Sequence, residues 1–174
     1  MTTTTISVGE IKTERLGGEP QRKYYIAYWY NFLQTTIHKF WVFVYLLQAC
    51  WALIKRGIMH DLSKYSKHEA PIFAKNIFKL KTVVYGTPEY KKLLKEVSVA
   101  TKHHYKCNTH HCEHWPHGLE DLSPLDSVEM ICDFKAASRR HKKGSLYYSI
   151  VVNAKRFGYN DNVKKAYIRM ANEL

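Results

Sequence analysis

Histidine and aspartate side chains recur along this chain in an order that could build a metal site. A lone histidine is usually structural. Imidazole and carboxylate groups that successive helices bring together bind Mn, Fe, Co, Ni or Zn, and open positions can hold Mg. We therefore expect one or two divalent metal ions as cofactors. The candidate ligands and their neighbours are, in chain order, His38, His60, Asp61, His104, His110, His111 and Asp133.

The adjacent pair His60-Asp61 is the centre of the predicted site. Neighbouring residues of a helix point about 100° apart, so an ion above the edge between them can take both side chains. His38 and Asp133 would complete a set of two histidines and two aspartates that leaves positions for water and substrate. A bound divalent ion makes hydroxide available near neutral pH, which predicts a hydrolytic reaction.

A second ion could share Asp61 with the first and take His104 together with His110 or His111. Two ions roughly 3.5–4 Å apart clamp the attacking and leaving oxygens of a displacement reaction. Helical spacing puts His104 in phase with an apolar face, which favours it over His103. Other roles stay open for these residues, because His104 or His110 could act as a general acid and His111 could contact the substrate.

The hydrophobic pattern predicts an all-α helical bundle. Apolar residues recur at helical spacing, and strand-like alternation is never sustained. We expect a flexible N-terminal arm over residues 1–20 and a single helical domain over residues 21–174. The pattern allows a break between a helix that begins near Gln21 and a second helix over residues 32–55. A short helix should then carry His60-Asp61.

Several helix starts can be placed from local chemistry. Thr87-Pro88 and Ser123-Pro124 each combine an N-cap residue with proline at the first helical position. A further start near Pro71 conflicts with a possible capping box from Ser66 to Glu69, because proline would then fall in the second turn. The sequence does not decide between these two.

The charge of the chain points to an anionic partner. Its 174 residues include 27 Lys and Arg against 15 Asp and Glu, for a net charge of +12. Such a balance suits a nucleotide, another phosphorylated small molecule or a nucleic acid. Lys64, His111, Asn153, Lys155 and Arg156 are the candidate phosphate contacts. A homo-oligomer is also compatible with the sequence.

Cysteine usage and hydropathy suggest a cytoplasmic protein. Cys50 and Cys132 stand among apolar residues and are expected to be buried free thiols, whereas Cys107 and Cys112 with nearby histidines could instead form a structural zinc knuckle. The apolar segment over residues 40–54 has 15 residues, and a spanning helix needs about 20. We therefore expect a core helix and no membrane.

The ordered ligand series resembles the HD-domain superfamily of metal-dependent phosphohydrolases. His60-Asp61, with Lys64 three residues after the aspartate, is similar to the helix end of that superfamily with the pattern His-Asp-x-Gly-Lys. An uncharacterised HD-like family of bacteria and their viruses is similar over longer stretches. These stretches are residues 60–66, 104–115, 128–138 and 149–158.

The resemblance implies an all-helical fold and hydrolysis of a nucleotide or related phosphate ester. It implies metal ligation by His60 and Asp61, and also by His38 and Asp133. Asp61, Lys64, His104 and His110 are the candidate catalytic residues. Two other functions are considered beside it. One is an HD-like di-iron oxygenase, which needs the additional histidines. The other is a basic helical module that binds nucleic acid without catalysis.

Overall fold

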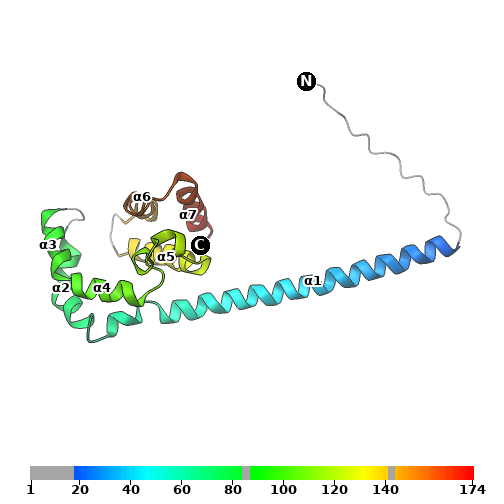
Figure 1. The fold of residues 1–174 in the computed structure, drawn as a ribbon, viewed down its shortest axis with the longest axis horizontal. Coiled ribbons are helices and arrows are strands. Elements are labelled where there is room, and N and C mark those ends of the chain that lie inside the picture. Colours follow the sequence, from blue (N-terminus) through cyan, green and yellow to red (C-terminus); the bar gives the residue numbers. More distant parts are fainter. Residues whose placement is uncertain (1–17, 84–86, 141–143) are drawn as a thin grey trace, which may run out of the picture. The chain divides into compact units, whose positions relative to one another are not determined.

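The computed structural model describes residues 18–83, 87–140 and 144–174, and these residues form seven α-helices and three short 3-10 helices without a strand (Figure 1). The all-α prediction is confirmed. The chain divides into two units, Met1–Cys50 and Trp51–Leu174. The predicted arm lies outside the described residues over 1–17, and residues 18–20 already belong to a helix. The prediction of one domain over residues 21–174 stays a prediction.

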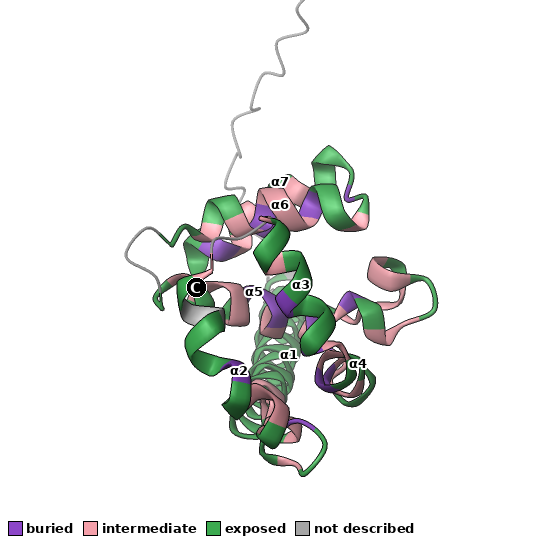
Figure 2. Cartoon of the chain, turned by 90° about the vertical axis from the view of Figure 1, so that its left-hand side faces the viewer, coloured by how far each residue is buried: buried purple, intermediate pink, exposed green. Residues whose placement is uncertain are grey.

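The first helix, α1, runs without interruption over Gly18–Met59. The break that the sequence allows near residue 31 is absent. No proline or glycine stands between Gln21 and Arg56, so nothing removes a backbone donor or weakens the helix there. The part of α1 in the first unit is exposed over almost its whole length (Figure 2).

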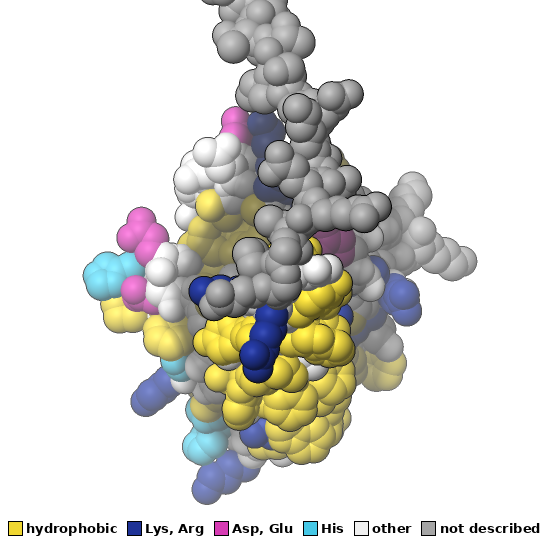
Figure 3. All heavy atoms as spheres, turned by 90° about the vertical axis from the view of Figure 1, so that its right-hand side faces the viewer, with side chains coloured by type: hydrophobic (Ala, Val, Ile, Leu, Met, Phe, Trp, Pro, Cys, Tyr) yellow, Lys and Arg dark blue, Asp and Glu magenta, His cyan; other side chains and the backbone are white. Residues whose placement is uncertain are grey.

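The exposed side chains of α1 are mostly apolar, and hydrophobic groups dominate the face of the molecule in Figure 3. A window of 18 residues within Gln21–Tyr65 reaches a mean hydropathy of 1.5, so this helix is long and apolar enough to cross a membrane. The core helix of a soluble protein meets the same criterion but is mostly buried, whereas this window is 0% buried, so the expected core helix over residues 40–54 is not found. The expectation of a cytoplasmic protein without a membrane therefore stays a prediction.

The second unit holds the end of α1 and six further helices. They are α2 (Ala70–Thr82), α3 (Pro88–Glu96), α4 (Ser98–Cys107), α5 (Pro124–Ser138), α6 (Leu146–Phe157) and α7 (Asp161–Glu173). The 3-10 helices are η1 (Leu62–Tyr65), η2 (Cys112–His114) and η3 (Gly118–Asp121). Thr87 and Ser123 cap α3 and α5 as predicted.

The start of α2 settles the conflict in the sequence. Glu69 is the N-cap and Pro71 falls in the first turn, where its missing N–H is not needed. The capping box from Ser66 does not form, since Ser66 Oγ has no hydrogen-bond partner and the Glu69 side chain makes no cap hydrogen bond. That side chain is instead directed at two histidines of α4.

The core of the second unit lies where α5, α6 and α7 pack on one another. Ile131 of α5 and Ile150 of α6 are the most deeply buried side chains there. The rings of Tyr159 and Tyr167 meet edge to face with their centroids 5.5 Å apart. This packing fixes α5, which carries Glu129 and Asp133.

Two cysteines depart from the prediction. Cys50 and Cys132 are both exposed rather than buried. Apolar neighbours in sequence lie on different faces of a helix, so they do not bury a residue between them. Cys50 belongs to the exposed part of α1, and Cys132 lines a cavity between the end of α1 and α5.

The packing of α5 gives a direct test of the core. Ile131→Ala removes a side chain with 0% exposure and should lower the free energy of unfolding by about 2–5 kcal/mol. Val99→Ala, which truncates a branched side chain that is 68% exposed, should change it by less than about 0.5 kcal/mol. Urea unfolding of both variants measures the difference, and equal losses would contradict this core assignment.

Candidate metal centre

A turn at the end of α1 places His60 and Asp61. The helix ends at Met59, and Asp61 has the left-handed backbone values φ 56° and ψ 20°. It is the one described non-glycine residue with positive φ. The prediction of a short helix carrying His60-Asp61 is therefore wrong, because this conformation interrupts the helix. Aspartate tolerates it better than most residues, and η1 begins directly afterwards.

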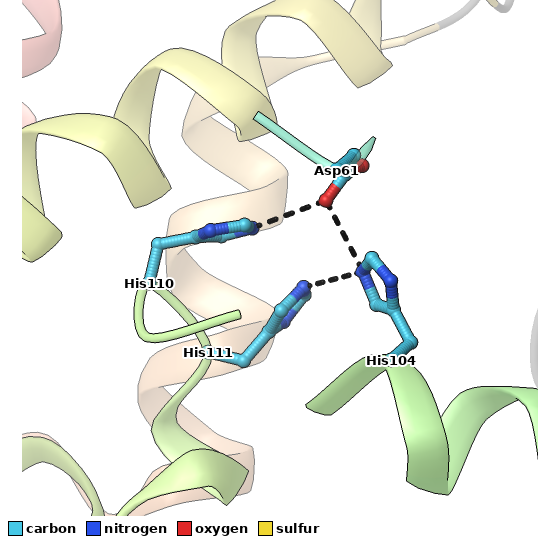
Figure 4. A group of neighbouring side chains, drawn as sticks. All are labelled: Asp61, His104, His110 and His111. Atoms are coloured by element: carbon cyan, nitrogen blue, oxygen red, sulfur yellow. Dashed lines mark hydrogen bonds and ion pairs between the residues drawn. The ribbon is translucent and has the colours of Figure 1, made fainter. Parts of the chain in front are cut away.

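Asp61 and three histidines form one group, which gathers on the side of the Asp61 Oδ1 atom (Figure 4). The Nε2 atoms of His104 and His110 lie 3.2 and 3.6 Å from Asp61 Oδ1. The Nε2 atom of His111 lies 3.0 Å from that of His104. His104 comes from α4, and the other two histidines come from the loop after it. Their ligand atoms all lie within 4.8 Å of one another.

A second group meets at the other oxygen of Asp61. The Nε2 atom of His60 lies 3.2 Å from Asp61 Oδ2 and 3.6 Å from Asp133 Oδ1. His60, Asp61 and Asp133 also satisfy the spacing of a metal-ligand set. Asp61 is thus common to two adjacent groups, which is the arrangement that a bridging carboxylate requires.

Glu129 is a central residue of the site that the sequence analysis missed, and with His60 and His110 it forms a third group whose ligand atoms lie close enough to hold a metal ion. Its Oε1 atom lies 3.0 Å from His60 Nδ1 and 3.1 Å from His110 Nδ1. Arg56 donates to its Oε2 atom at 2.9 Å. Glu129 stands four residues before Asp133, so the two carboxylates share a face of α5. That spacing is the signal in the sequence that could have identified it.

These contacts settle where the imidazole protons lie. An ionised carboxylate only accepts hydrogen bonds, so Nδ1 of His60 and of His110 must each carry a proton and donate it to Glu129. In the neutral form of His110, its Nε2 atom then has a lone pair facing Asp61. Asp61 Oδ1 and His110 Nε2 are both buried without a hydrogen-bond partner.

The electrostatics of the cluster differ from one histidine to the next. Contacts with Asp133, Asp61 and Glu129 raise the pKa of His60 to about 11. Burial and the neighbouring His110 and His104 lower the pKa of His111 to about 3. His111 is therefore a neutral donor of electron pairs, whereas an ion that binds His60 must displace its Nε2 proton.

The carboxylates of the cluster are ionised despite their burial. Burial alone would raise the pKa of Asp61, but His104, His60 and Lys64 outweigh it and hold that pKa far below its usual range. Burial also opposes ionisation of Asp133, and contact with His60 lowers its pKa. Two anionic carboxylates and several nitrogen lone pairs therefore converge.

Lys64 lies at the edge of the cluster. Its ammonium group donates to Asp61 Oδ2 at 2.5 Å, and its side chain is 40% exposed. An exposed cation beside the convergent ligands can reach an anionic substrate from the solvent side. A cavity of about 340 Å³ with a mainly apolar lining adjoins the same region, against His60 and Asp133.

The remaining predicted residues are not part of this cluster. His38 is exposed on α1 within the first unit and belongs to none of the ligand groups among the described residues. Its assignment as a ligand stays a prediction. Cys107 and Cys112 are also outside these groups, and the buried Cys112 thiol is paired with the Tyr159 hydroxyl instead. This arrangement does not support a zinc knuckle.

The candidate phosphate contacts on α6 lie apart from the ligand groups. Asn153 donates to a carbonyl oxygen of its own helix, and Lys155 is exposed. Arg156 pairs with Glu113 at 2.5 Å. These two charged groups also act on the Tyr105 hydroxyl, and the Tyr105 ring lies 4.9 Å from that of His111. Tyr105 thus links Arg156 to the cluster.

Residues 27–174 match the model of a family described as "Family of unknown function (DUF5662)". The match covers most of the chain, and the chain belongs to this family. No curated protein and no solved structure matches the chain.

The raised pKa of His60 predicts how the metal-free protein responds to pH. A histidine whose pKa rises on folding stabilises the fold fully below its unfolded value of about 6.5, and this contribution is lost as pH rises toward about 11. The stability advantage of the metal-free protein over His60→Gln should therefore shrink between pH 6.5 and pH 9. Urea unfolding across that range measures it. The exposed-site variant His117→Gln should show a smaller trend, and an advantage that grows with pH would contradict the assignment.

Proposed function

We propose that this protein is a metal-dependent phosphohydrolase of the HD type that acts on a nucleotide or related phosphate ester. The observation that supports the proposal most strongly is that two buried polar atoms, Asp61 Oδ1 and His110 Nε2, have no hydrogen-bond partner. A buried polar atom without a partner is unfavourable. A divalent cation between them would remove the penalty, and the donor set of imidazole and carboxylate suits such a cation.

Two ions fit the two ligand groups better than one. His104, His110 and His111 surround one oxygen of Asp61, and His60 and Asp133 surround the other. A carboxylate that faces two groups with its two oxygens can bridge two ions. Bound there, divalent ions would supply an activated water and would offset the charge of a phosphate group.

Glu129 would orient ligands of both ions. It accepts hydrogen bonds from Nδ1 of His60 and of His110, and these rings belong to different groups. A carboxylate on the far nitrogen of a metal-bound imidazole fixes its orientation and raises its basicity. Arg56 compensates the charge of Glu129, so the orienting carboxylate does not compete with Asp61 for the ions.

The geometry favours the ligand role for His104 and His110 over the role of general acid. Their Nδ1 atoms are directed at carboxylates and their Nε2 atoms at Asp61. Neither ring presents a free N–H to a substrate in this arrangement. Lys64 is better placed for contact with the reacting group, since it is exposed beside Asp61 and can bind a phosphate oxygen.

A di-iron oxygenase is the second candidate function. The observation that favours it is the nitrogen-rich group of His104, His110 and His111 on one side of Asp61. Imidazole is a common ligand of iron. Iron content together with an iron-dependent absorption band would favour oxygen chemistry over hydrolysis.

Asp61→Asn should remove metal binding and hydrolysis together, because the neutral amide cannot bridge two cations. We expect metal content after dialysis to fall from one or two ions per chain to almost none, with affinity reduced by more than about 100-fold. Elemental analysis and a screen of nucleotides and phosphate esters for released phosphate measure both effects.

Asp161→Asn is the matched control for this test, since it makes the same change in an exposed pair with Lys164. It should leave metal content and hydrolysis unchanged. Purified protein that keeps no divalent ion, or hydrolysis that persists in Asp61→Asn, would show that the proposal is wrong.

Lys64→Met should separate substrate binding from metal binding. Loss of a charged donor to the reacting phosphate is expected to lower kcat/KM by about 100-fold, while metal content stays at the level of the unmodified protein. Lys67→Met, at an exposed neighbouring position, should leave kcat/KM unchanged. An unaltered rate in Lys64→Met would exclude this lysine from the reaction.

A further inference from the structure

Glu69 is a carboxylate that neither the ligand groups nor the helix it precedes can explain. Its exposure is 0%, so both oxygens are removed from water. Its Oε1 atom lies 2.7 Å from His103 Nδ1, and its Oε2 atom lies 3.1 Å from His104 Nδ1. Burial of a carboxylate is costly unless hydrogen bonds and charge compensate it. These two histidines of α4 supply that compensation.

The position of Glu69 in the chain does not account for its side chain. Glu69 is the N-cap of α2, where serine, threonine, aspartate and asparagine are the favoured residues because their short side chains accept from the first turn. Glu69 makes no such bond. The local helix therefore gains nothing from the Glu69 carboxylate, and the benefit must lie at the histidines that it contacts.

We propose that Glu69 is a positioning residue for one of the two metal ions, the one held by His104, His110 and His111. The inference rests on the metal centre of the proposed function and adds a residue that acts on only one side of it. By holding the His104 ring through Nδ1, Glu69 directs Nε2 of that ring at Asp61.

The hydrogen bonds around His104 Nδ1 support this role. The Asn108 amide donates to the His104 carbonyl oxygen at 2.7 Å and to Ser63 Oγ at 2.8 Å. Both of its hydrogens are then used, so it cannot also donate to His104 Nδ1. Ser63 Oγ also lies 3.0 Å from His104 Nδ1, but a hydroxyl can donate or accept, whereas ionised Glu69, 3.1 Å away, can only accept. The Nδ1 proton of His104 therefore points at Glu69.

The position of this proton determines which ring nitrogen of His104 can bind a metal ion. With one proton held on Nδ1, Nε2 is the ring nitrogen that can offer a lone pair to a metal ion. That atom lies 3.2 Å from Asp61 Oδ1 and 3.0 Å from His111 Nε2, inside the ligand group. Glu69 thus selects the tautomer that a metal ligand needs.

His103 fixes the other end of the carboxylate. It holds Oε1 of Glu69, and its own ring stacks on that of His68 with centroids 4.9 Å apart. A carboxylate held at both oxygens cannot turn away from His104. His103 therefore has a role at the site that does not require it to bind a metal ion.

Glu69 and Glu129 differ in which ligands they reach. Glu129 contacts His60 and His110, which belong to the two groups on opposite sides of Asp61. Glu69 contacts only His104 among the described ligands. Loss of Glu69 should therefore weaken one ion selectively, whereas loss of Glu129 should weaken both.

The test compares Mn²⁺ binding by the full chain and by Glu69→Gln. Titration followed by the spectrum of free Mn²⁺ should give two sites in the unmodified protein. In Glu69→Gln we expect one site to lose about 10–100-fold in affinity and the other to keep its affinity. Glu96→Gln is the matched control, because it neutralises a surface carboxylate that pairs with Lys79 at 3.3 Å, and it should retain both affinities.

A second readout reports the His104 tautomer itself. Nitrogen NMR of the metal-free protein should show the proton of His104 on Nδ1, and Glu69→Gln should shift the ring toward the other tautomer. Glu69→Asp keeps the charge with a shorter reach and should restore part of the Mn²⁺ affinity. A purely structural role for Glu69 would not move the tautomer.

The outcomes separate this inference from the proposed function. Absence of Mn²⁺ binding by the unmodified protein would overturn the proposed function. If each site has the same Mn²⁺ affinity in Glu69→Gln as in the unmodified protein, only the role of Glu69 is overturned. An equal loss of affinity at both sites would have the same consequence. If Glu69→Gln does not fold, Glu69→Asp provides the same comparison, with selective weakening expected and unchanged affinities contradicting the inference.

Discussion

The arrangement around Asp61 imposes the constraint on which the rest of the site depends. Its carboxylate is ionised and largely buried, and ring nitrogens of the surrounding histidines converge on the same space. Acceptors gathered in this way repel one another unless protons or a cation lie between them. A proton on His60 separates that ring from the carboxylates around it. On the other side, His111 is neutral and His110 Nε2 has no hydrogen-bond partner. A divalent cation resolves the conflict on that side.

The fold supplies the means of holding these groups in place. The α5–α7 core fixes the helix that carries Glu129 and Asp133, and the turn after α1 presents His60 and Asp61 to it. Glu129 and Glu69 then bind the outer nitrogens of the imidazoles. These two carboxylates thereby determine which nitrogen of each ring faces inward. Orientation by such neighbours is what makes a group of histidines a metal site rather than a cluster of polar side chains.

Helical periodicity predicted much of this arrangement. It selected His104 over His103, and the structure leaves them 4% and about a third exposed, respectively. The cap residues Thr87 and Ser123 located two helix starts, because N-cap chemistry is local. The turn at Asp61 was missed because nothing in His60-Asp61-Leu-Ser demands a left-handed residue. Glu129 and Glu69 were missed because their roles depend on partners far away in sequence, such as His60, 69 residues from Glu129, and His104, 35 residues from Glu69. Periodicity predicts which face of a helix is buried, but it does not predict which side chains contact that face.

The central claim is that Asp61 binds divalent metal ions together with the surrounding imidazoles. Anomalous diffraction from crystals grown with Mn²⁺ tests it most directly. The account predicts anomalous peaks at bonding distance from the Asp61 carboxylate, with Nε2 of His104 and of His110 on one side and Nε2 of His60 on the other. It would be contradicted by crystals in which no peak lies near Asp61 and its Oδ1 atom accepts a hydrogen bond from a protonated histidine or a water molecule.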